Sequence, residues 1–180
     1  MYKHLEIDAA PLGRLVVGLE NHQVVFAHLA RRQADLERIL DGERKRFPTM
    51  HLTTENHPVA TLLQAYLDGD VVDPVDVPVR WSQGTEFQQR VWQTLRRVRR
   101  GQLVTYSGLA AMAGNPRAAR AVGGAVSRNP LVLFVPCHRV VAAGGGIGGF
   151  SAGLDAKRRW LSLEGVDEAC LSGRIHEHSG

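Results

Sequence analysis

The stretch from Asn129 to Val140 constrains the fold of this chain most, because an apolar run ends there in a proline and three reactive side chains. The run from Leu131 to Val135 contains no polar residue, which is the pattern of a strand buried on both faces. Pro136 has no backbone N–H and therefore predicts the end of that strand. The side chains that follow are those of Cys137, His138 and Arg139.

Cys137 is expected to be a nucleophile. Most unpaired cysteines are small buried hydrophobic residues, but such a cysteine has no use for an adjacent imidazole and guanidinium. A nearby cation, here Arg139, or an imidazolium lowers the pKa of a thiol and raises the thiolate fraction. The second of the two cysteines is Cys170, so the sequence carries no disulfide framework and fits a reducing, intracellular setting.

Charge is distributed unequally along the chain. Residues 1–79 carry 8 Lys/Arg and 12 Asp/Glu, a balance of −4, whereas residues 80–165 carry 13 basic and 3 acidic side chains, a balance of +10. Such a segment creates a positive field that attracts a polyanion, and nucleic acid is the obvious one. Solvated basic faces are common where lysines make them, but arginines dominate here, and arginine suits phosphate and base recognition better.

Length and composition predict a globular protein. A chain of 180 residues can hold one large domain or two small ones, and 44% hydrophobic with 22% charged residues is ordinary for such proteins. No apolar run approaches the length of a membrane span, and the first residues do not have the pattern of a signal peptide. We therefore expect a cytoplasmic protein without a membrane partner.

The first half predicts a small α+β domain. Three short strands, separated by turn residues, are expected at Tyr2–Asp8, Arg14–Glu20 and Gln23–Leu29. Helical patterns follow at Ala34–Arg46 and Val59–Leu67. We place this domain at residues 1–78, with a proline-rich linker at about residues 70–80. Its histidines match no metal-ligand pattern and are interpreted as surface residues: His4, His22, His28, His51 and His57.

The second half predicts a mainly helical domain over residues 79–165. A helix is expected to begin at Thr85, which forms a capping box with Gln88, and to end at Gly101. A short helix over Ser107–Ala113, a Gly-containing turn and a second helix over Pro116–Ser127 have the pattern of a helix-turn-helix. The domain is expected to close with a helix capped by Asp155 and ending at Glu164–Gly165, before a flexible tail over residues 166–180.

The second helix of that motif, Pro116–Ser127, has little side-chain bulk. Asn115 is its expected N-cap, alanine and glycine dominate it, and Arg117 and Arg120 project. Packed core helices can also be rich in alanine. A helix that reads the major groove normally carries Asn, Gln or Arg at several base-reading positions. The composition therefore suits close approach to a narrow groove and predicts binding with little sequence preference.

With these features the chain resembles the O6-alkylguanine-DNA alkyltransferases, also called methylated-DNA–protein-cysteine methyltransferases. The resemblance covers residues 81 to about 165, where motifs follow one another at matching spacing; the N-terminal part matches only in general plan. It rests on Asn129–Pro130, Pro136–Val140, Glu164–Gly165, Gly101–Tyr106, Ala118–Gly124 and Gly148–Ser151. It implies an α+β fold: a small N-terminal α/β domain with a three-stranded antiparallel, ribonuclease H-like sheet, and a mainly helical C-terminal domain with a helix-turn-helix and the active-site cysteine.

The resemblance implies DNA repair by direct reversal of damage. An SN2 displacement transfers the alkyl group of O6-alkylguanine, and also of O4-alkylthymine, to Cys137. The product is a thioether that water does not reverse, so each molecule reacts once. The implied partner is double-stranded DNA with an alkylated guanine, bound by a monomer through the minor groove, with the target nucleotide rotated out. No cofactor is expected, and no metal, because the cysteine ligands of the structural zinc in some members are absent here.

Roles for single residues follow from the same resemblance. The catalytic group comprises Cys137 as nucleophile, His138 as base, Glu164 as its orienting partner, Asn129 as brace of the turn and Tyr106 as donor to the guanine. The implied substrate-binding residues are Val140, Ser151, Phe150, Ile147 and Lys157. The implied DNA contacts are Arg120, which fills the vacated stack, Tyr106, which crowds the adjacent phosphate, and Ala119, Ala121, Arg117 and Gly123.

Two departures from the family pattern bear on the substrate. Phe150 stands where many members have tyrosine, and Ala152–Gly153 stands where many have two glycines. Activity on methyl groups is expected to survive these two changes.

Three other functions explain this sequence less completely. A Cys-His-Glu hydrolase or acyltransferase would use the same triad but leaves the basic helix-turn-helix unexplained. Alkyltransferase-like damage sensors have tryptophan in place of Cys137. A transcription regulator would need more base-reading side chains in its recognition helix.

Overall fold

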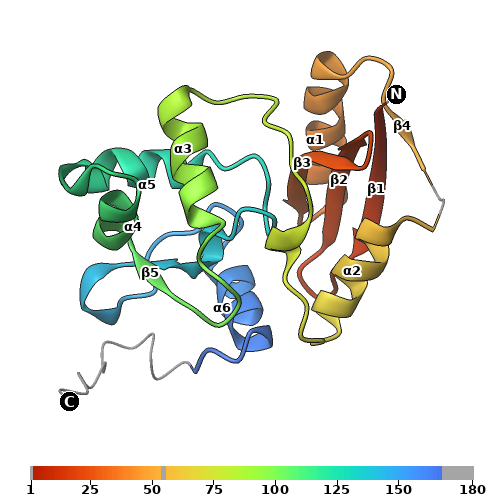
Figure 1. Cartoon of the computed structure of the whole chain (residues 1–180). Helices are drawn as coiled ribbons and strands as arrows, with labels where there is room; N and C mark the ends of the chain where they lie inside the picture. Colours follow the sequence, from red (N-terminus) through yellow and green to blue (C-terminus); the bar gives the residue numbers. More distant parts are fainter. Residues whose placement is uncertain (1, 54–55, 168–180) are drawn as a thin grey trace. The chain divides into compact units, whose positions relative to one another are not determined.

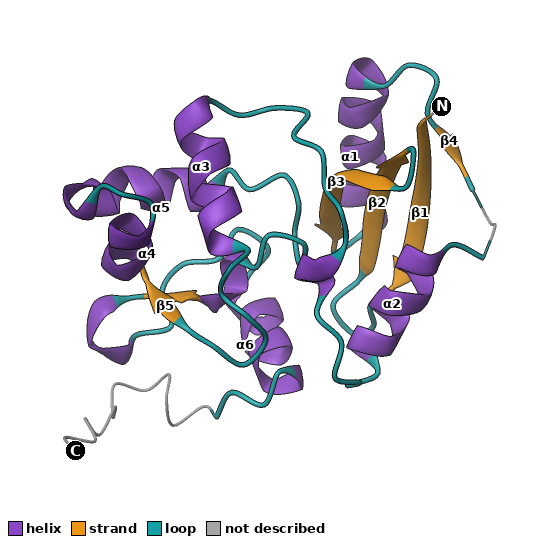
Figure 2. Ribbon diagram, viewed as in Figure 1, coloured by secondary structure: helices purple, strands orange, loops and turns teal. Residues whose placement is uncertain are grey.

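A computed structural model describes residues 2–53 and 56–167, and it confirms a mixed α+β fold (Figures 1 and 2). The chain divides into two compact units. The N-terminal unit comprises Met1–Gly84 together with Pro130–Phe134, and the C-terminal unit comprises Thr85–Asn129 and Val135–Gly180. Within the described residues, no helix has the length and apolar character needed to cross a membrane. The predicted tail lies almost entirely outside the described residues, as does Cys170.

The N-terminal unit is built on a four-stranded sheet with the order β3-β2-β1-β4. Three of its strands are antiparallel and confirm the predicted ranges to within one residue: β1 (Tyr2–Asp8), β2 (Arg14–Glu20) and β3 (Gln23–Ala30). The fourth, β4 (His51–Leu52), pairs with β1 in parallel. The prediction of three strands was therefore incomplete, because two residues are too few to show an alternating pattern.

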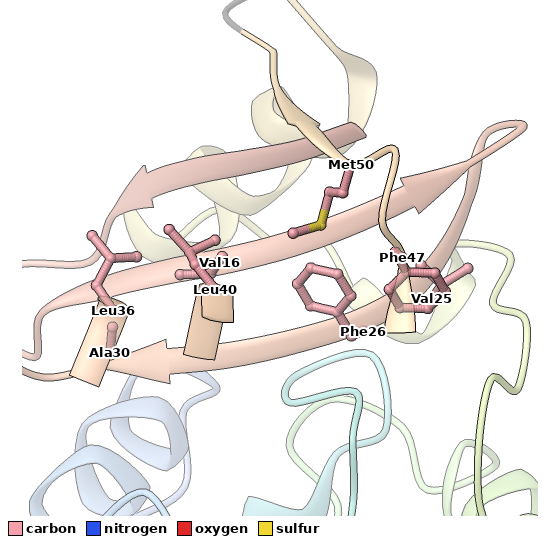
Figure 3. Close-up of a cluster of buried hydrophobic side chains, with 8 residues drawn as sticks. All are labelled: Val16, Val25, Phe26, Ala30, Leu36, Leu40, Phe47 and Met50. Carbon is pink, nitrogen blue, oxygen red and sulfur yellow. The ribbon is translucent and has the colours of Figure 1, made fainter. Parts of the chain in front are cut away.

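Helix α1 (Gln33–Arg46) covers one face of this sheet, and α2 (Pro58–Leu67) follows β4 in the chain. Leu36 and Leu40 recur at helical spacing on α1 and are buried. They belong to a cluster with side chains of β2, β3 and the segment after α1 (Figure 3): Val16, Val25, Phe26, Ala30, Phe47 and Met50. The predicted linker contains a short 3₁₀ helix, η1 (Pro74–Asp76).

Gly18 of β2 is required by the packing of this core. It lies opposite Phe26 of β3, and a Cβ built on Gly18 would lie 2.0 Å from Cε1 of the Phe26 ring. Phe26 is fully buried and stacks on Phe47, with ring centroids 5.9 Å apart. The glycine therefore leaves room for an aromatic ring that anchors the sheet to the segment after α1.

Three of the histidines interpreted as surface residues are not fully exposed, namely His4, His28 and His57. His4 of β1 is 2% exposed, and burial lowers its pKa against the opposing effect of Glu6. His28 of β3 is half-buried, with Nε2 3.0 Å from Oε1 of the buried Glu43. For His4 and His28 the surface interpretation was wrong because strand residues alternate between two covered faces, and for His57 because its ring accepts from Val59 N at 3.2 Å as the N-cap of α2. Among the described residues, no group of three or more His, Cys, Asp or Glu is placed to hold a metal ion.

The outer edge of β3 is covered by two segments from much later in the chain. Val24 accepts a hydrogen bond from Arg80 N and donates one to Pro78 O, at 2.9 and 3.0 Å. Ala27 donates to Pro130 O at 2.8 Å and accepts from Val132 N at 3.0 Å. The segment Pro130–Phe134 is therefore held by the backbone of β3.

The apolar run from Leu131 to Val135 is buried as predicted, but it is not a continuous strand. It forms an isolated β-bridge between Leu131 and Ala27, and then Leu133 adopts a positive φ of 70°. A positive φ ends the extended conformation, which explains why the ladder stops. Burial was predictable from the run, whereas this turn was not.

The C-terminal unit is mainly helical. Its α-helices are α3 (Glu86–Leu95), α4 (Tyr106–Met112), α5 (Ala119–Ser127) and α6 (Leu154–Leu163). Three short 3₁₀ helices lie between them: η2 (Pro116–Ala118), η3 (Cys137–Arg139) and η4 (Ala143–Gly145). Two short parallel strands, β5 (Val104–Thr105) and β6 (Val140–Val141), pair the residues just before α4 with those just after η3.

Several helix ends differ from their predictions. The Thr85–Gln88 capping box is confirmed, but α3 ends at Leu95, and Gly101, with φ 78°, lies in a later turn. The helix predicted from Pro116 begins as a 3₁₀ turn, and Asn115 makes no side-chain cap. The N-cap of α6 is Gly153, so Asp155 lies in the first turn and does not cap it. A glycine with φ 97° at that position starts the helix without a capping side chain.

Candidate active site

Cys137 lies on the tight turn that follows the buried run. The turn begins at Pro136 and continues as η3, and Cys137 N donates to Val135 O at 2.8 Å. The amide of Asn129 braces this turn, because its Nδ2 donates to Val135 O at 2.8 Å and to Cys137 Sγ at 3.1 Å. One side chain therefore contacts both the backbone of the turn and the sulfur.

His138 is held by a buried carboxylate. Its Nε2 lies 2.8 Å from Oε1 of Glu164, and neither side chain is appreciably exposed. Because an ionised carboxylate can only accept, Nε2 carries the proton and donates. This tautomer leaves the lone pair on Nδ1, an atom that is buried and has no hydrogen-bond partner in the protein. His138 is thus arranged as a proton acceptor.

Arg139 is fully buried and neutralises the same carboxylate. Its Nε donates to Glu164 Oε2 at 2.9 Å and its Nη2 to Oε1 at 2.8 Å, which is a bidentate pair. Its Nη1 donates to Val98 O at 2.7 Å. Glu164 Oε2 also accepts from Gly101 N at 3.4 Å. The carboxylate of Glu164 therefore joins η3 to the turns after α3 and α6.

The protonation states follow from these contacts. Burial alone would raise the pKa of Glu164, but the hydrogen bonds and charges of His138 and Arg139 outweigh it and hold that pKa well below its usual range. Burial lowers the pKa of His138, and the Glu164 carboxylate opposes that shift. At neutral pH the pair is therefore a carboxylate with a neutral imidazole that it orients.

The cation that acts on the pKa of the Cys137 thiol is Lys157, rather than Arg139. Burial raises the pKa of the Cys137 thiol, and the Asn129 hydrogen bond and the charge of Lys157 partly oppose this. Lys157 is fully buried on α6, and its Nζ donates to Val140 O at 2.5 Å and to Gly149 O at 3.2 Å. Burial lowers its pKa to about 8. The prediction of a lowered thiol pKa was wrong, because burial raises it, and the cation that opposes the rise is Lys157 while Arg139 forms its bidentate pair with Glu164.

A cavity of about 110 Å³ opens beside the sulfur of Cys137. Its lining includes five of the predicted residues: Tyr106, Gly123, Cys137, Phe150 and Ser151. Val126, Ser127 and Gly149 also line it and were not predicted. Gly123, Val126 and Ser127 are three and four residues apart on α5, so the helical spacing from Gly123 was the signal that could have found them.

Tyr106, the first residue of α4, lies where two glycine-containing segments approach its ring. A Cβ built on Gly123 would lie 3.7 Å from Cδ1 of the tyrosine, and one built on Gly148 would lie 3.4 Å from its hydroxyl oxygen. Burial raises the pKa of Tyr106, against a hydrogen bond with the backbone of Gly149. The phenol therefore stays protonated at neutral pH and can donate.

Three aromatic rings form a row from the cavity wall to His138. Phe150 meets Trp160 of α6 edge to face, with ring centroids 5.6 Å apart, and Trp160 meets His138 in the same way at 5.6 Å. Trp160 was not among the predicted site residues. In the sequence it is one apolar position of an amphipathic helix, and nothing there separates it from an ordinary core residue.

The remaining predicted residues lie around this centre without lining the cavity. Val140 is buried in β6 with its carbonyl bonded to Lys157, and Ile147 is half-buried. Arg117 of η2 is exposed, as are Arg120 and Ala121 of α5, whereas Ala119 is half-buried. Both arginines are therefore exposed to solvent, and α5, which carries Arg120, also lines the cavity through other residues.

Comparison with known proteins places this arrangement in a family. Residues 86–166 match the family model described as 6-O-methylguanine DNA methyltransferase, DNA binding domain. The methylated-DNA–protein-cysteine methyltransferase of Haemophilus influenzae is 34% identical over 163 residues, which span 87% of this chain and 83% of that one. The inducible enzyme of that name from Bacillus subtilis is 37% identical over 132 residues, 72% of this chain and 73% of the relative.

Solved structures agree with the sequence matches over nearly the whole chain. The crystal structure of Mycobacterium tuberculosis O6-methylguanine methyltransferase has 32% sequence identity and a TM-score of 0.74, covering 91% of this chain and 93% of that one. The structure of Mycobacterium tuberculosis OGT in complex with DNA has 30% identity and a TM-score of 0.75, covering 94% and 98%. On these grounds the chain belongs to the methylated-DNA–protein-cysteine methyltransferase family.

Proposed function

We propose that this protein repairs DNA by moving the alkyl group of O6-methylguanine onto the sulfur of Cys137, once per molecule. One observation carries the proposal: a buried thiol is bonded to Asn129 and followed by an oriented His138–Glu164 pair, beside a cavity that Tyr106 and Phe150 line. Membership of the family supports the same reaction.

The chemistry begins with the thiol proton. His138 Nδ1 has a free lone pair and accepts this proton, and the Glu164 carboxylate stabilises the imidazolium that forms. The thiolate keeps the Asn129 hydrogen bond and the nearby charge of Lys157. Glu164 is itself fixed by Arg139, so the base is oriented before the substrate arrives.

The thiolate then attacks the alkyl carbon. The S–C bond forms as the C–O6 bond breaks, and the electron pair of that bond leaves with the guanine. Tyr106 donates a hydrogen bond to the guanine ring as negative charge develops there, which its raised pKa permits. Val140 and Ser151 hold the edge of the base, with Phe150 and Ile147 as walls and Lys157 fixing the backbone of the loops. O4-alkylthymine presents the same type of alkyl carbon and is included.

The reaction ends with a thioether at Cys137. A neutral thioether has no good leaving group, and none of the cavity-lining residues offers a second thiol or amine to accept the alkyl group. The protein is therefore consumed by its reaction, one equivalent for each lesion.

A base inside a duplex cannot reach a buried cysteine, so the target nucleotide is rotated out of the helix. The exposed Arg120 fills the vacated stack, and Arg117, Ala119, Ala121 and Gly123 approach the minor groove as the second helix of a helix-turn-helix. The +10 balance of residues 80–165 supplies the attraction to the phosphates of double-stranded DNA. Binding through the backbone and a narrow groove has little sequence preference.

The proposal assigns different roles to the two halves of the chain. Residues 79–165 form the DNA-binding and alkyl-transfer domain, and residues 1–78, with a ribonuclease H-like sheet and a linker at about residues 70–80, form the structural domain. The protein acts as a monomer in the cytoplasm, on the nucleoid of a prokaryote or in the nucleus of a eukaryote.

Cys137→Ala tests the proposal directly. Duplex DNA with a radiolabelled methyl group on O6 of guanine should transfer one equivalent of label to the wild-type protein and none to Cys137→Ala, which should still bind the duplex. Cys170→Ala is the matched control and should accept the label normally. Transfer to the Cys137→Ala protein, or transfer well above one equivalent to the wild type, would refute the assignment.

A further inference from the structure

Strand β1 is paired with β2 along one edge, but its other edge is only partly covered. β4 pairs with the first part of that edge, where His4 O accepts a hydrogen bond from Thr53 N at 2.9 Å. The backbone groups of a strand point to its two edges in alternate residues, so those of Glu6 and Asp8 lie on the same edge as those of His4. Within residues 2–53 and 56–167, no backbone group bonds to Glu6 or Asp8 along this edge. The described chain therefore leaves the second part of the edge unpaired.

A groove of about 600 Å³ lies between this part of β1 and helix α2, which contact each other in the N-terminal unit (Figure 1). We call it the edge groove. From β1 it is lined by Glu6, Ile7 and Asp8, and from α2 by a face on which Ala60 and Gln64 are four residues apart. Ligand sites commonly have volumes of about 300–1,000 Å³, so a short segment of chain has room here. Unpaired backbone groups beside an open groove are the geometry in which an extended peptide adds a strand to a sheet.

The edge groove is lined by carboxylates and by no cationic side chain. Glu6 is paired with Arg14 of β2 at 2.8 Å. Asp8, Asp68 and Asp70 also line the groove and are exposed, and no residue in the described part of the chain forms an ion pair with them. Nor do any three acidic or histidine side chains of the described residues gather closely enough to hold a metal ion. The carboxylates are therefore spread along the groove, which suits several cations on an extended chain better than one ion.

We propose that the edge groove binds an extended basic segment of another protein, which adds to the sheet as a strand beside β1. Its backbone bonds to Glu6 and Asp8, and its lysine or arginine side chains meet the carboxylates of the groove. Side chains of a strand alternate between two faces, so the segment presents one set to α2 and the other to the opposite face of the sheet. Residues 1–79 have a charge balance of −4, so this half attracts a cationic segment while residues 80–165 attract DNA. Disordered basic arms of this kind are typical of nucleic-acid-binding proteins.

Charge argues against a second copy of this chain as the occupant. Two β1 edges paired with each other would bring the carboxylates of Glu6 and Asp8 of both copies together, and like charges on opposite strands destabilise the pair. Charged side chains on an edge strand commonly keep other chains away in this manner. Here all the charges of the groove have one sign, so they repel acidic edges and attract basic ones. The same carboxylates thus prevent self-association and select the partner.

The test uses the whole protein and a rhodamine-labelled octapeptide in which lysine alternates with valine or threonine. Fluorescence anisotropy should show binding that weakens as salt rises, and no binding of a matched peptide with glutamate in place of lysine. Amide hydrogen exchange, followed by NMR, locates the peptide. In the free protein the amides of Glu6 and Asp8 should exchange faster than those of Leu5 and Ile7, which face β2. Saturating unlabelled peptide should slow the Glu6 and Asp8 amides about tenfold or more.

Matched variants and matched peptides separate charge from strand pairing. The double variant Asp68→Asn/Asp70→Asn should weaken peptide binding about fivefold, since exposed ion pairs are individually weak. Glu37→Gln/Asp41→Asn removes the same charge from exposed positions of α1 and should bind the peptide as the wild type does. Two further peptides carry N-methyl groups on the backbone of either the lysines or the residues between them. Only one of these sets faces β1, so one peptide should fail to bind and the other should bind normally.

Four results would overturn the proposal. Equal binding, or equal loss of binding, by the two N-methylated peptides would exclude strand addition. Wild-type affinity in Asp68→Asn/Asp70→Asn, or an equal loss in Glu37→Gln/Asp41→Asn, would remove the groove as the source of the charge attraction. Slow exchange of the Glu6 and Asp8 amides without peptide would show that the edge is already covered. Protection of those amides that grows with protein concentration would assign the edge to a second copy of the chain.

Discussion

Glu164→Gln is expected to cost a large part of the stability of this protein. The carboxylate accepts hydrogen bonds at 2.8 to 2.9 Å from His138 Nε2, Arg139 Nη2 and Arg139 Nε, and all three side chains are buried. The amide keeps the size of the side chain but leaves the Arg139 guanidinium without its counter-charge. Removing one partner of a buried ion pair costs about 3–5 kcal/mol, compared with about 5–15 kcal/mol for the stability of a typical protein. Urea unfolding at pH 7, followed by tryptophan fluorescence, measures the loss.

The same carboxylate makes the unfolding free energy of the wild-type protein depend on pH, and its lowered pKa fixes the direction of that dependence. The pKa of Glu164 in the folded protein is held below its unfolded value of about 4.3. The stabilisation is therefore complete above that unfolded pKa, and it is lost as the pH falls below it towards the folded pKa. Glu164→Gln should lack this part of the acid dependence, so the difference in unfolding free energy between the two proteins should shrink below about pH 4.

A double-mutant cycle decides whether the ion pair is the cause. Arg139→Met alone leaves a buried carboxylate, so the double variant with Glu164→Gln should lose clearly less than the sum of the single losses. Asp41→Asn is the control, because Asp41 pairs with Arg44 at 3.5 Å on the surface and should show no measurable change. A loss below about 1 kcal/mol for Glu164→Gln, or single losses that add within about 0.5 kcal/mol, would refute the reasoning.

Three other perturbations test separate parts of the structure. Gly18→Ala should destabilise the protein by about 1–3 kcal/mol, because its Cβ would overlap the Phe26 ring. Gly42→Ala is the control, because nothing lies near that position of α1, and it should stabilise the protein by about 0.5–1 kcal/mol. Thermal melts in which Gly18→Ala is the more stable of the two variants would contradict the described core packing. Arg120→Ala should slow methyl transfer from duplex DNA more than dealkylation of the free base, since only a duplex has a stack to fill; equal losses in both assays would argue against extrusion. Duplex binding should weaken linearly on a log–log plot against salt, because the +10 segment displaces counterions, and a flat response in fluorescence titrations would exclude that role.

Local patterns were enough to predict most elements of this fold. The three antiparallel strands follow from alternation and turn residues, and the start of α3 follows from the capping box at Thr85, since these signals depend on neighbouring residues alone. Element ends were less predictable. Gly101 was expected to end α3, and it has the positive φ that is common just after a helix. The helix nevertheless ends at Leu95, and Gly101 lies in a later turn. A glycine in the sequence indicates a turn but does not show whether that turn directly follows the helix.

The candidate site was predictable as a set of residues but not as a set of contacts. Cys137 and His138 are adjacent in sequence, so their proximity needed no tertiary information. That Glu164 takes up the charge of Arg139, and that Lys157 acts on the thiol instead, depends on how α6 packs against η3. Trp160 carries no sequence signal at all, because its ring contacts with Phe150 and His138 exist only in the folded protein.

The backbone pairing of Ala27 with Pro130 and Val132 has a consequence for how the protein is made. On a ribosome that adds about 5–20 residues per second, β3 emerges roughly 5 to 20 s before the segment that completes its outer edge. During that interval this stretch of the strand exposes unpaired N–H and C=O groups, which are a template for other chains. Nascent chains that stall between residues 80 and 130 should therefore be the aggregation-prone species, and the codons that set the rate over this interval should influence the yield of active protein.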